Sequence, residues 1–250
     1  MNHRPTPMPR FMRWRSNICQ APVFFAMTAI CGTIALIVSL FDRSGRRQHG
    51  VARIWARISL LASWAPLRIV GAENLRKYPV AVYASNHTSY MDVPVLFSTL
   101  PFQFRILAKK ELWRLPFIGW YLERSGQMPI DSANPSATRA SLGDAVKTLR
   151  KGMPLFVFPE GRRTLSGDLN PFQSGAAYLA LRAQVPLVPI ALSGVYDLLP
   201  MHTHHFFPTQ LTLHVGEPIE TLGMTLRQLD ELNQQLRSAI EAMLGAETKA

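Results

Sequence analysis

His87 and Asp92 are the residues of this chain best suited to acid–base chemistry, because an imidazole and a carboxylate follow the strand-like residues 80–85. A neutral imidazole can remove a proton from an alcohol near neutral pH, and a carboxylate behind it fixes the tautomer and stabilises the imidazolium. Within one regular helix, residues five apart are rotated about 140° beyond a full turn, so the two side chains would diverge. Convergence therefore requires a strand that ends near Ser85 and a helix that starts near Ser89, with His87 in the turn between them.

Asp92 also has a purely structural interpretation. Ser89 and Asp92 match the spacing of a Ser-x-x-Asp capping box, in which both side chains bond to backbone N–H groups at a helix start. Taken alone, this motif favours helix capping as the role of Asp92. A second motif further along the chain shifts the balance toward chemistry.

The second motif is a charged turn that follows an apolar run. Residues 155–158 are typical of a buried parallel strand, so Glu160, Gly161, Arg162 and Arg163 are expected at its carboxyl end, where ligands bind in open α/β sheets. Glycine permits close backbone approach, and a guanidinium can bind a phosphate through two hydrogen bonds. The alternative is a solvated turn whose Arg–Glu pair contributes roughly 0–1 kcal/mol. Together with His87, the turn indicates a phosphorylated ligand.

Four blocks of the chain resemble those of the glycerolipid acyltransferase family, specifically the bacterial 1-acyl-glycerol-3-phosphate acyltransferases, and they follow one another along the chain as they do in the family. Residues 86–92 match the His-x-x-x-x-Asp block, residues 158–163 match Phe-Pro-Glu-Gly-Thr-Arg, and residues 188–190 match Val-Pro-Val/Ile. Residues 126–132, beginning at Gly126, match the remaining block less closely. A single block is weak, whereas four in the right order and spacing are specific, and the resemblance spans about residues 80–194.

Two departures from the family pattern bear on the acceptor. Arg162 replaces the Thr of the Phe-Pro-Glu-Gly-Thr-Arg block. Ser132 stands where the family usually has an Arg that helps to hold the acceptor phosphate. The reaction type is therefore better supported than the acceptor, and either Arg139 or Arg162 could compensate.

The resemblance implies a thioester-dependent acyl transfer to a lysophospholipid, most directly lysophosphatidic acid. It assigns His87 as the base and Asp92 as its orienting partner. The expected headgroup contacts are Glu160, Gly161, Arg162, Arg163 and Gly126. No cofactor or metal is expected, and the donor is either acyl-CoA or acyl carrier protein. The alternatives are the same chemistry on another lysolipid, such as lyso-ornithine lipid, or a non-catalytic protein that binds anionic lipid.

The charge of the chain indicates an anionic partner. Its 250 residues carry a net charge of +11, and residues 1–50 contain seven Arg and one Asp. No helix-turn-helix, zinc finger or RNA-binding aromatic motif is evident, so membrane lipid explains the charge better than nucleic acid. The three histidines His202, His204 and His205 have no nearby cysteine or carboxylate cluster, which argues against a metal site.

An uncharged and mostly apolar run covers residues 16–41, long enough to cross a hydrocarbon core of about 30 Å. A signal peptide is the competing interpretation, but its apolar region would be shorter and would end at a cleavage site. We therefore expect a retained anchor, which basic residues on both flanks leave without a set orientation. The resemblance implies the bacterial inner membrane, with the catalytic domain on the cytoplasmic side.

The remaining pattern predicts the α/β class, with a mainly parallel sheet flanked by helices. Strands are expected at residues 80–85, 104–108, 128–130, 155–158, 187–192 and 211–215, and helices at 51–67, 94–99, 136–150 and 175–183. The 51–67 helix suits either the membrane interface or a domain surface. A capping box of Thr225 and Gln228 starts a final amphipathic helix. We expect an anchor and interfacial helix over residues 1–70 and an α/β acyltransferase domain over 71–250.

Overall fold

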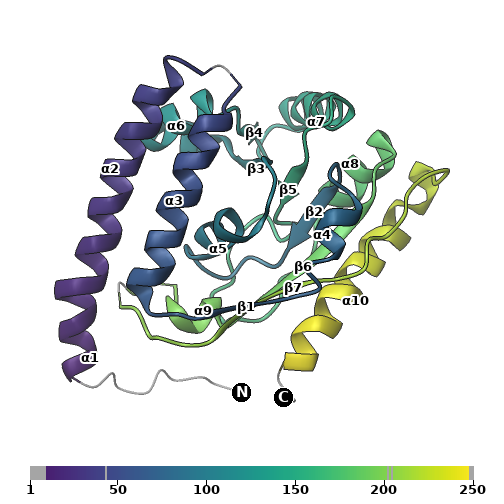
Figure 1. Ribbon diagram of the computed structural model, residues 1–250. Helices are drawn as coiled ribbons and strands as arrows, with labels where there is room; N and C mark the ends of the chain where they lie inside the picture. The colour runs from purple at the N-terminus through teal and green to yellow at the C-terminus, as the bar shows by residue number, and fades with distance from the viewer. Residues whose placement is uncertain (1–9, 43, 202, 204, 248–250) are drawn as a thin grey trace.

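The apolar runs fold into seven strands of one sheet, in the order β1-β7-β6-β2-β5-β3-β4 (Figure 1). The computed structural model describes residues 10–42, 44–201, 203 and 205–247, so His202 and His204 lie outside the described residues. The strands are β1 Leu67–Val70, β2 Val82–Ser85, β3 Arg105–Lys109, β4 Met128–Ile130, β5 Leu155–Val157, β6 Leu187–Ser193 and β7 Leu211–Val215. Strands β2 to β6 are parallel and β7 is antiparallel to β6, which confirms a mainly parallel sheet.

Helices connect and cover these strands. They are α1 Arg10–Arg15, α2 Ala21–Ser39, α3 Arg46–Ser63, α4 Asn74–Lys77, α5 Asp92–Thr99, α6 Ile118–Arg124, α7 Pro135–Arg150, α8 Gly175–Ala183, α9 Val195–Leu198 and α10 Leu229–Glu247. A π-helical stretch, Ser16–Gln20, joins α1 to α2, and 3-10 helices occupy Lys110–Arg114 and Leu226–Gln228. The capping box of Thr225 and Gln228 is confirmed ahead of α10.

Both faces of the sheet are buried, as a parallel sheet requires. All four β2 residues are buried, and the alternation of side chains divides them between two cores. Tyr83 and Phe156 lie in one core with residues of α3 and α5. Val82 and Leu155 lie in the other with residues of α7, α8 and α10. The central strands are therefore fixed from both sides, and the turns at their carboxyl ends have a rigid support.

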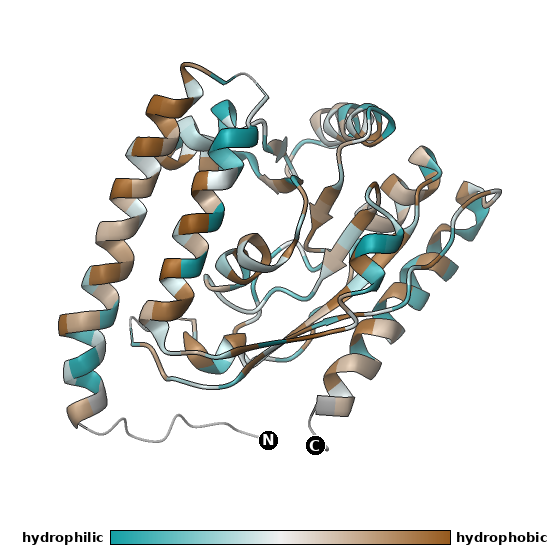
Figure 2. Cartoon of the chain, in the orientation of Figure 1, coloured by the Kyte–Doolittle hydropathy of each residue, from teal (hydrophilic) through white to brown (hydrophobic). Residues whose placement is uncertain are grey.

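Helices α2 and α3 form an antiparallel pair along one side of the sheet (Figure 1). Side chains tie them at both ends, because Gln20 donates to the Ser63 carbonyl at 3.0 Å and Gln48 donates to the Ala35 carbonyl at 3.3 Å. The helical segment Arg13–Ser39 is long and apolar enough to cross a membrane by length and composition. Only 11% of its apolar window is buried, and Figure 2 shows hydrophobic residues over most of α2. The pair therefore lies against the domain while it exposes an apolar outer face.

The start of the sheet and the extent of helix α3 both differ from the ranges expected from the sequence. Strand β1 lies within the residues expected to belong to the anchor, yet it pairs in register with β7, from Leu67 with Leu211 to Val70 with His214. The sheet therefore begins before residue 71. The predicted 51–67 helix also lies earlier, as α3, and ends at Ser63 because Trp64 adopts a left-handed conformation with φ of 55°.

Candidate active site

The turn that carries His87 is fixed by side-chain bonds to the neighbouring strand. The Asn86 amide donates to the Leu192 carbonyl at 3.0 Å and accepts from the Leu192 N–H at 2.8 Å. The Ser89 hydroxyl donates to the Leu199 carbonyl at 2.8 Å. These bonds attach the segment after β2 to the end of β6 and to the loop beyond it. His87 is thereby presented at the carboxyl edge of the parallel strands, where ligands bind in open α/β sheets.

The structure brings His87 and Asp92 together. The Nδ1 atom of His87 lies 2.7 Å from Oδ2 of Asp92, and the Asp92 side chain is fully buried. The same oxygen accepts the backbone N–H groups of Thr88 at 2.7 Å and Ser89 at 2.9 Å. Because these donors leave the oxygen as an acceptor, the proton of the His87–Asp92 bond belongs on Nδ1. The Nε2 atom is then the nitrogen with a free lone pair, as a general base needs.

The capping interpretation holds in part. Helix α5 begins at Asp92, and the Ser89 side chain makes no capping bond to the Asp92 N–H. Instead, the Asp92 carboxylate holds the N–H groups of the preceding turn while it also contacts His87. One buried carboxylate therefore shapes the turn and fixes the imidazole.

Phe158 supports the imidazole from one face. The two rings stack with centroids 3.9 Å apart and planes inclined by 17°, and the His87 side chain is 19% exposed. The sequence assigned Phe158 to the end of a strand and to the Phe-Pro-Glu-Gly-Thr-Arg block, but gave no signal for a contact with His87. The stack and the Asp92 bond together leave the ring little freedom to rotate.

Glu160 holds two backbone segments of the site together through its carboxylate. Its Oε1 accepts the backbone N–H of His87 at 2.7 Å, and its Oε2 accepts the backbone N–H of Asn170 at 2.8 Å. Burial raises the pKa of Glu160, and these two N–H groups oppose that rise. Both oxygens bond to backbone N–H groups of the protein, and the expected contact of Glu160 with the acceptor stays a prediction. Glu160 positions the turn that carries His87.

Gly161 serves the backbone of the same turn. Its φ is +67°, a conformation that favours glycine, and its N–H donates to the Phe158 carbonyl at 3.0 Å. A side chain here would collide with the amide of Gln173. The turn therefore requires glycine at this position, and the expected substrate contact through Gly161 stays a prediction.

Arg162 and Arg163 line a hollow of about 360 Å³ together with Thr164, Leu165, Ser166 and Asn170. The Thr164 N–H donates to the His87 carbonyl at 2.9 Å, which joins one wall of the hollow to the backbone of His87. The Arg163 guanidinium lies 3.7 Å from the centroid of the Tyr90 ring, a cation–π contact. Tyr90 was another residue that sequence reasoning missed, although an exposed aromatic inside the His-Asp turn is a usable signal.

Gly126 is not brought into this cluster. It precedes β4 and so lies at the amino end of that strand, whereas His87 lies beyond the carboxyl end of β2. Its φ is +71°, and a Cβ added at this position would lie 3.1–3.2 Å from the Arg105 guanidinium group. The structure therefore places Gly126 at the opposite edge of the sheet from His87, and its predicted contact with substrate stays a prediction.

Ser132 lies just beyond the carboxyl end of β4, on the same edge as His87, and is exposed. Arg139 is an exposed residue of α7 and does not line the hollow, whereas Arg162 does. Of the two arginines that could compensate for Ser132, the structure places Arg162 beside Arg163. Among the described residues, no three His, Cys, Asp or Glu side chains are grouped to hold a metal.

A His–Asp pair beside an arginine-lined hollow, at the carboxyl edge of a parallel sheet, defines a site for acyl or phosphoryl chemistry, and the comparisons with known proteins decide between them. The family model described as Acyltransferase matches residues 66–193, just over half of the chain. The chain therefore belongs to the acyltransferase family.

Its relatives carry more specific names. The chain is 30% identical over 221 residues to a 1-acyl-sn-glycerol-3-phosphate acyltransferase of Saccharomyces cerevisiae, which covers 83% of this chain and 70% of the relative. It is 34% identical over 189 residues to a chloroplastic 1-acyl-sn-glycerol-3-phosphate acyltransferase of Brassica napus, which covers 71% of this chain. The chain spans about half of that relative, 54% of its length.

The fold also matches a solved structure. The crystal structure of the 1-acyl-sn-glycerophosphate acyltransferase PlsC from Thermotoga maritima superposes with a TM-score of 0.79. The match covers 96% of this chain and 98% of the other, at 23% sequence identity. The α/β architecture and the N-terminal helices therefore belong to a known arrangement.

Proposed function

We propose that this protein transfers an acyl group from a thioester to the free sn-2 hydroxyl of 1-acyl-glycerol-3-phosphate, giving phosphatidic acid. The observation that carries the proposal is the 2.7 Å bond between His87 and Asp92 beside a hollow lined by two arginines. The names of the Saccharomyces cerevisiae and Brassica napus relatives support this acceptor.

His87 is the proposed general base. Its Nε2 takes the hydroxyl proton while the hydroxyl oxygen attacks the thioester carbonyl carbon. Asp92, 2.7 Å from Nδ1, stabilises the imidazolium that forms. The carbon–sulfur bond then breaks, and the departing thiolate takes the proton from Nε2. A positioned base contributes about 10²–10⁴ in rate. The reaction needs no metal or cofactor in this scheme, and the donor is acyl-CoA or acyl carrier protein.

Arg162 and Arg163 are the proposed headgroup contacts. Both line the hollow beside His87, and a guanidinium group can bind two of the three terminal oxygens of a phosphate monoester. The Arg163 guanidinium lies 3.7 Å from the centroid of the Tyr90 ring, and a face contact of this kind leaves the N–H groups of the guanidinium free to bind a phosphate. Arg162 thereby supplies the second cation that Ser132 lacks. Glu160 and Gly161 act through the shape of the turn.

The α2–α3 pair is the proposed membrane anchor. The outer face of α2 carries exposed apolar side chains such as Phe25, Ile30 and Ile34. Because bonds from Gln20 and Gln48 tie α2 to α3, and α3 packs in the core of the domain, we propose that α2 enters one leaflet and the interface beside the catalytic domain. The expected location is the bacterial inner membrane with the domain on the cytoplasmic side, where both donor types are made.

A lysolipid panel tests the proposal. Purified protein in detergent is mixed with a labelled acyl thioester and with either lysophosphatidic acid or lyso-ornithine lipid, and the lipid products are separated. The proposal predicts labelled phosphatidic acid as the main product. Preference for lyso-ornithine lipid would favour the alternative that Ser132 motivates, with the chemistry unchanged. Transfer to neither acceptor would refute both and favour a non-catalytic lipid-binding role.

A further inference from the structure

A second apolar surface lies outside the α2–α3 pair, on the segment between β3 and β4. The 3-10 helix Lys110–Arg114 and helix α6 expose a group of large apolar side chains where they meet. We call this group the apolar knob, and its members are Leu115, Phe117, Ile118 and Trp120. Contiguous exposed apolar side chains of this size mark interaction surfaces more often than chance exposure.

The backbone holds Phe117 outward at an energetic cost. Its φ of 62° and ψ of −52° approach those of the rare γ-turn with positive φ, and the Ile118 N–H donates to the Pro116 carbonyl at 2.7 Å. A bulky residue in this conformation is strained, and such strain gathers at functional positions. The strained turn leaves Phe117 61% exposed, with its ring 5.2 Å from that of Trp120.

The knob is a fixed feature because α6 packs tightly on the 3-10 helix before it. Any side chain at Gly119 would collide with the carbonyl of Trp113. The Trp113 ring nitrogen also donates to a Glu123 carboxylate oxygen at 3.0 Å. These contacts lock the knob into one arrangement, so its exposure cannot be relieved by folding back onto the protein.

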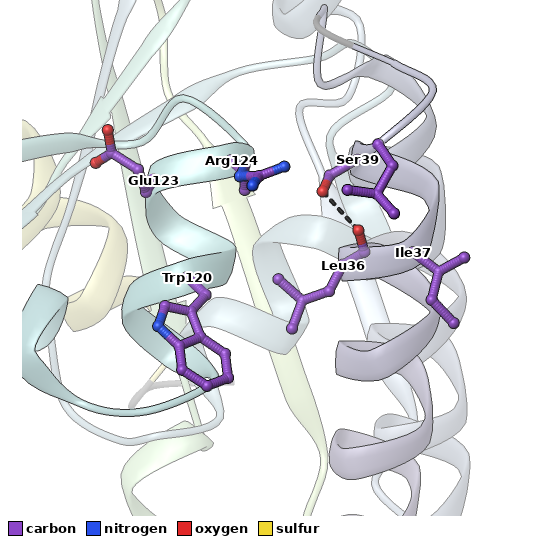
Figure 3. Close-up of a pocket in the computed structure, with 7 residues that line it drawn as sticks. Leu36, Ile37, Ser39, Trp120, Glu123 and Arg124 are labelled. Atoms are coloured by element: carbon purple, nitrogen blue, oxygen red, sulfur yellow. Dashed lines mark hydrogen bonds between the residues drawn. The ribbon is translucent and has the colours of Figure 1, made fainter.

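The knob continues the apolar face of α2. A crevice of about 480 Å³ separates the end of α2 from α6, with Leu36, Ile37 and Leu40 on one wall and Trp120 on the other (Figure 3). Most of the lining surface is apolar, and Ser39, Glu123 and Arg124 also line the crevice. An apolar crevice of this volume beside the anchor suits an acyl chain.

Basic side chains flank the knob on both sides. Arg114 precedes it and Arg124 follows it, and both are exposed. Glu123 lies between them, and its carboxylate accepts the ring N–H of Trp113 at 3.0 Å. Aromatic residues between basic ones are typical of segments at a membrane interface, where rings enter the acyl boundary and cations meet phosphates.

We propose that the apolar knob is a second membrane contact, inserted into the bilayer interface beside α2, and that the crevice receives one acyl chain of a bilayer phospholipid. The inference rests on the proposed α2 anchor, since the crevice joins the two surfaces. Its consequence is orientation. The 3-10 helix begins directly after the carboxyl end of β3, so the second contact tilts the edge that carries His87 toward the bilayer.

Depth measurements with single cysteine reporters test this inference. Cys19→Ser and Cys31→Ala remove the native thiols, and an environment-sensitive dye is attached at Phe117→Cys, at Phe25→Cys on the outer face of α2, or at Ser238→Cys on α10. Phe25 and Ser238 are exposed, which makes them matched positive and negative controls. Full-length protein is bound to vesicles of phosphatidylglycerol and phosphatidylcholine with brominated or unbrominated chains. No substrate is present, so the result is independent of catalysis.

The inference predicts a blue shift and bromine quenching for the dyes at positions 117 and 25, with neither effect at position 238. An Ile118→Cys reporter repeats the measurement without altering the strained residue. Quenching at 25 with none at 117 or 118 would overturn the second contact and keep the anchor. Absence of quenching at 25 and 117 would overturn both proposals, and equal quenching at all positions would overturn the specific orientation.

Discussion

Replacing Asp92 by Asn isolates the charge of the carboxylate from its shape. In the wild type, Oδ2 of Asp92 accepts the N–H groups of Thr88 and Ser89 at 2.7 and 2.9 Å, and an amide oxygen can still accept both. The new amide N–H₂ would take the place of Oδ1, which lies 3.2 Å from the Thr88 hydroxyl oxygen. The turn should therefore keep its fold. What disappears is the interaction between the carboxylate and the imidazolium that forms on His87 in the transition state.

The size of that interaction follows from the geometry. Unit charges 2.7 Å apart interact by about 6 kcal/mol at an effective dielectric constant of about 20, which sets an upper limit. Only part of the charge has developed in the transition state, so we expect a kcat loss of about 10²–10⁴, equivalent to roughly 3–5 kcal/mol. The acceptor KM should change little, because the lost interaction is made only in the transition state.

The assay is steady-state release of the thiol product with both substrates varied, together with a thermal unfolding curve. Asp144→Asn is the matched control, since that exposed carboxylate pairs only with Lys147 at 2.8 Å on α7. The control should keep wild-type kcat. An Asp92→Asn protein that folds normally and keeps kcat within about tenfold of wild type would refute this account of the pair.

Three further changes give separate tests. Arg163→Gln should raise the acceptor KM about tenfold or more and the donor KM less, because guanidinium–phosphate pairs are charge-assisted hydrogen bonds. Steady-state kinetics measure both constants, with Arg139→Gln as the control. Equal effects on both substrates would contradict a role of Arg163 in binding the acceptor. Tyr90→Leu should lower the acceptor kcat/KM about 3- to 30-fold and Tyr90→Phe should restore it, since a cation–π contact contributes roughly 0.5–2 kcal/mol; failure of Phe to rescue would exclude the ring. Burial, together with the charges of Arg53 and Arg105, lowers the pKa of His49 to about 4 from its ordinary value of 6.5, so between these two pH values the unfolded chain binds a proton at His49 and the folded chain does not. The free energy of unfolding should therefore fall by about 2 kcal/mol as the pH drops from 7 to 5. His49→Leu should remove this part of the fall, as measured by chemical unfolding curves.

Much of the fold could be predicted because its central strands are buried on both faces. Strands β2, β5 and β6 consist almost wholly of buried residues, so they stand out as continuous apolar runs. Strand β1 was missed because its burial is incomplete and it closely follows the apolar pattern of α3. The start of α3 was also missed, because Gln48 and His49 are buried although both are polar. Local apolar periodicity carries no signal for such residues.

The site divides in the same way between local and distant contacts. The His87–Asp92 contact could be predicted because one short turn supplies both residues. The hydrogen bonds of Glu160 could not be predicted, because its partners are the backbone N–H groups of His87 and Asn170. His87 is 73 residues away in the sequence. Gly126 is a different case. It lies in a family block, yet the structure places it before β4, at the other edge of the sheet from His87, and gives it a positive φ.

The most direct test of the catalytic assignment is acyl transfer by His87→Ala under single-turnover conditions, with a labelled thioester and lysophosphatidic acid. The imidazole is the only proposed base, and its removal leaves the backbone bonds of the turn to Glu160 and Asp92 in place. We predict that phosphatidic acid formation falls by about 10²–10⁴, while the thermal unfolding midpoint stays close to that of the wild type. Wild-type rates of phosphatidic acid formation by the His87→Ala protein would contradict the account.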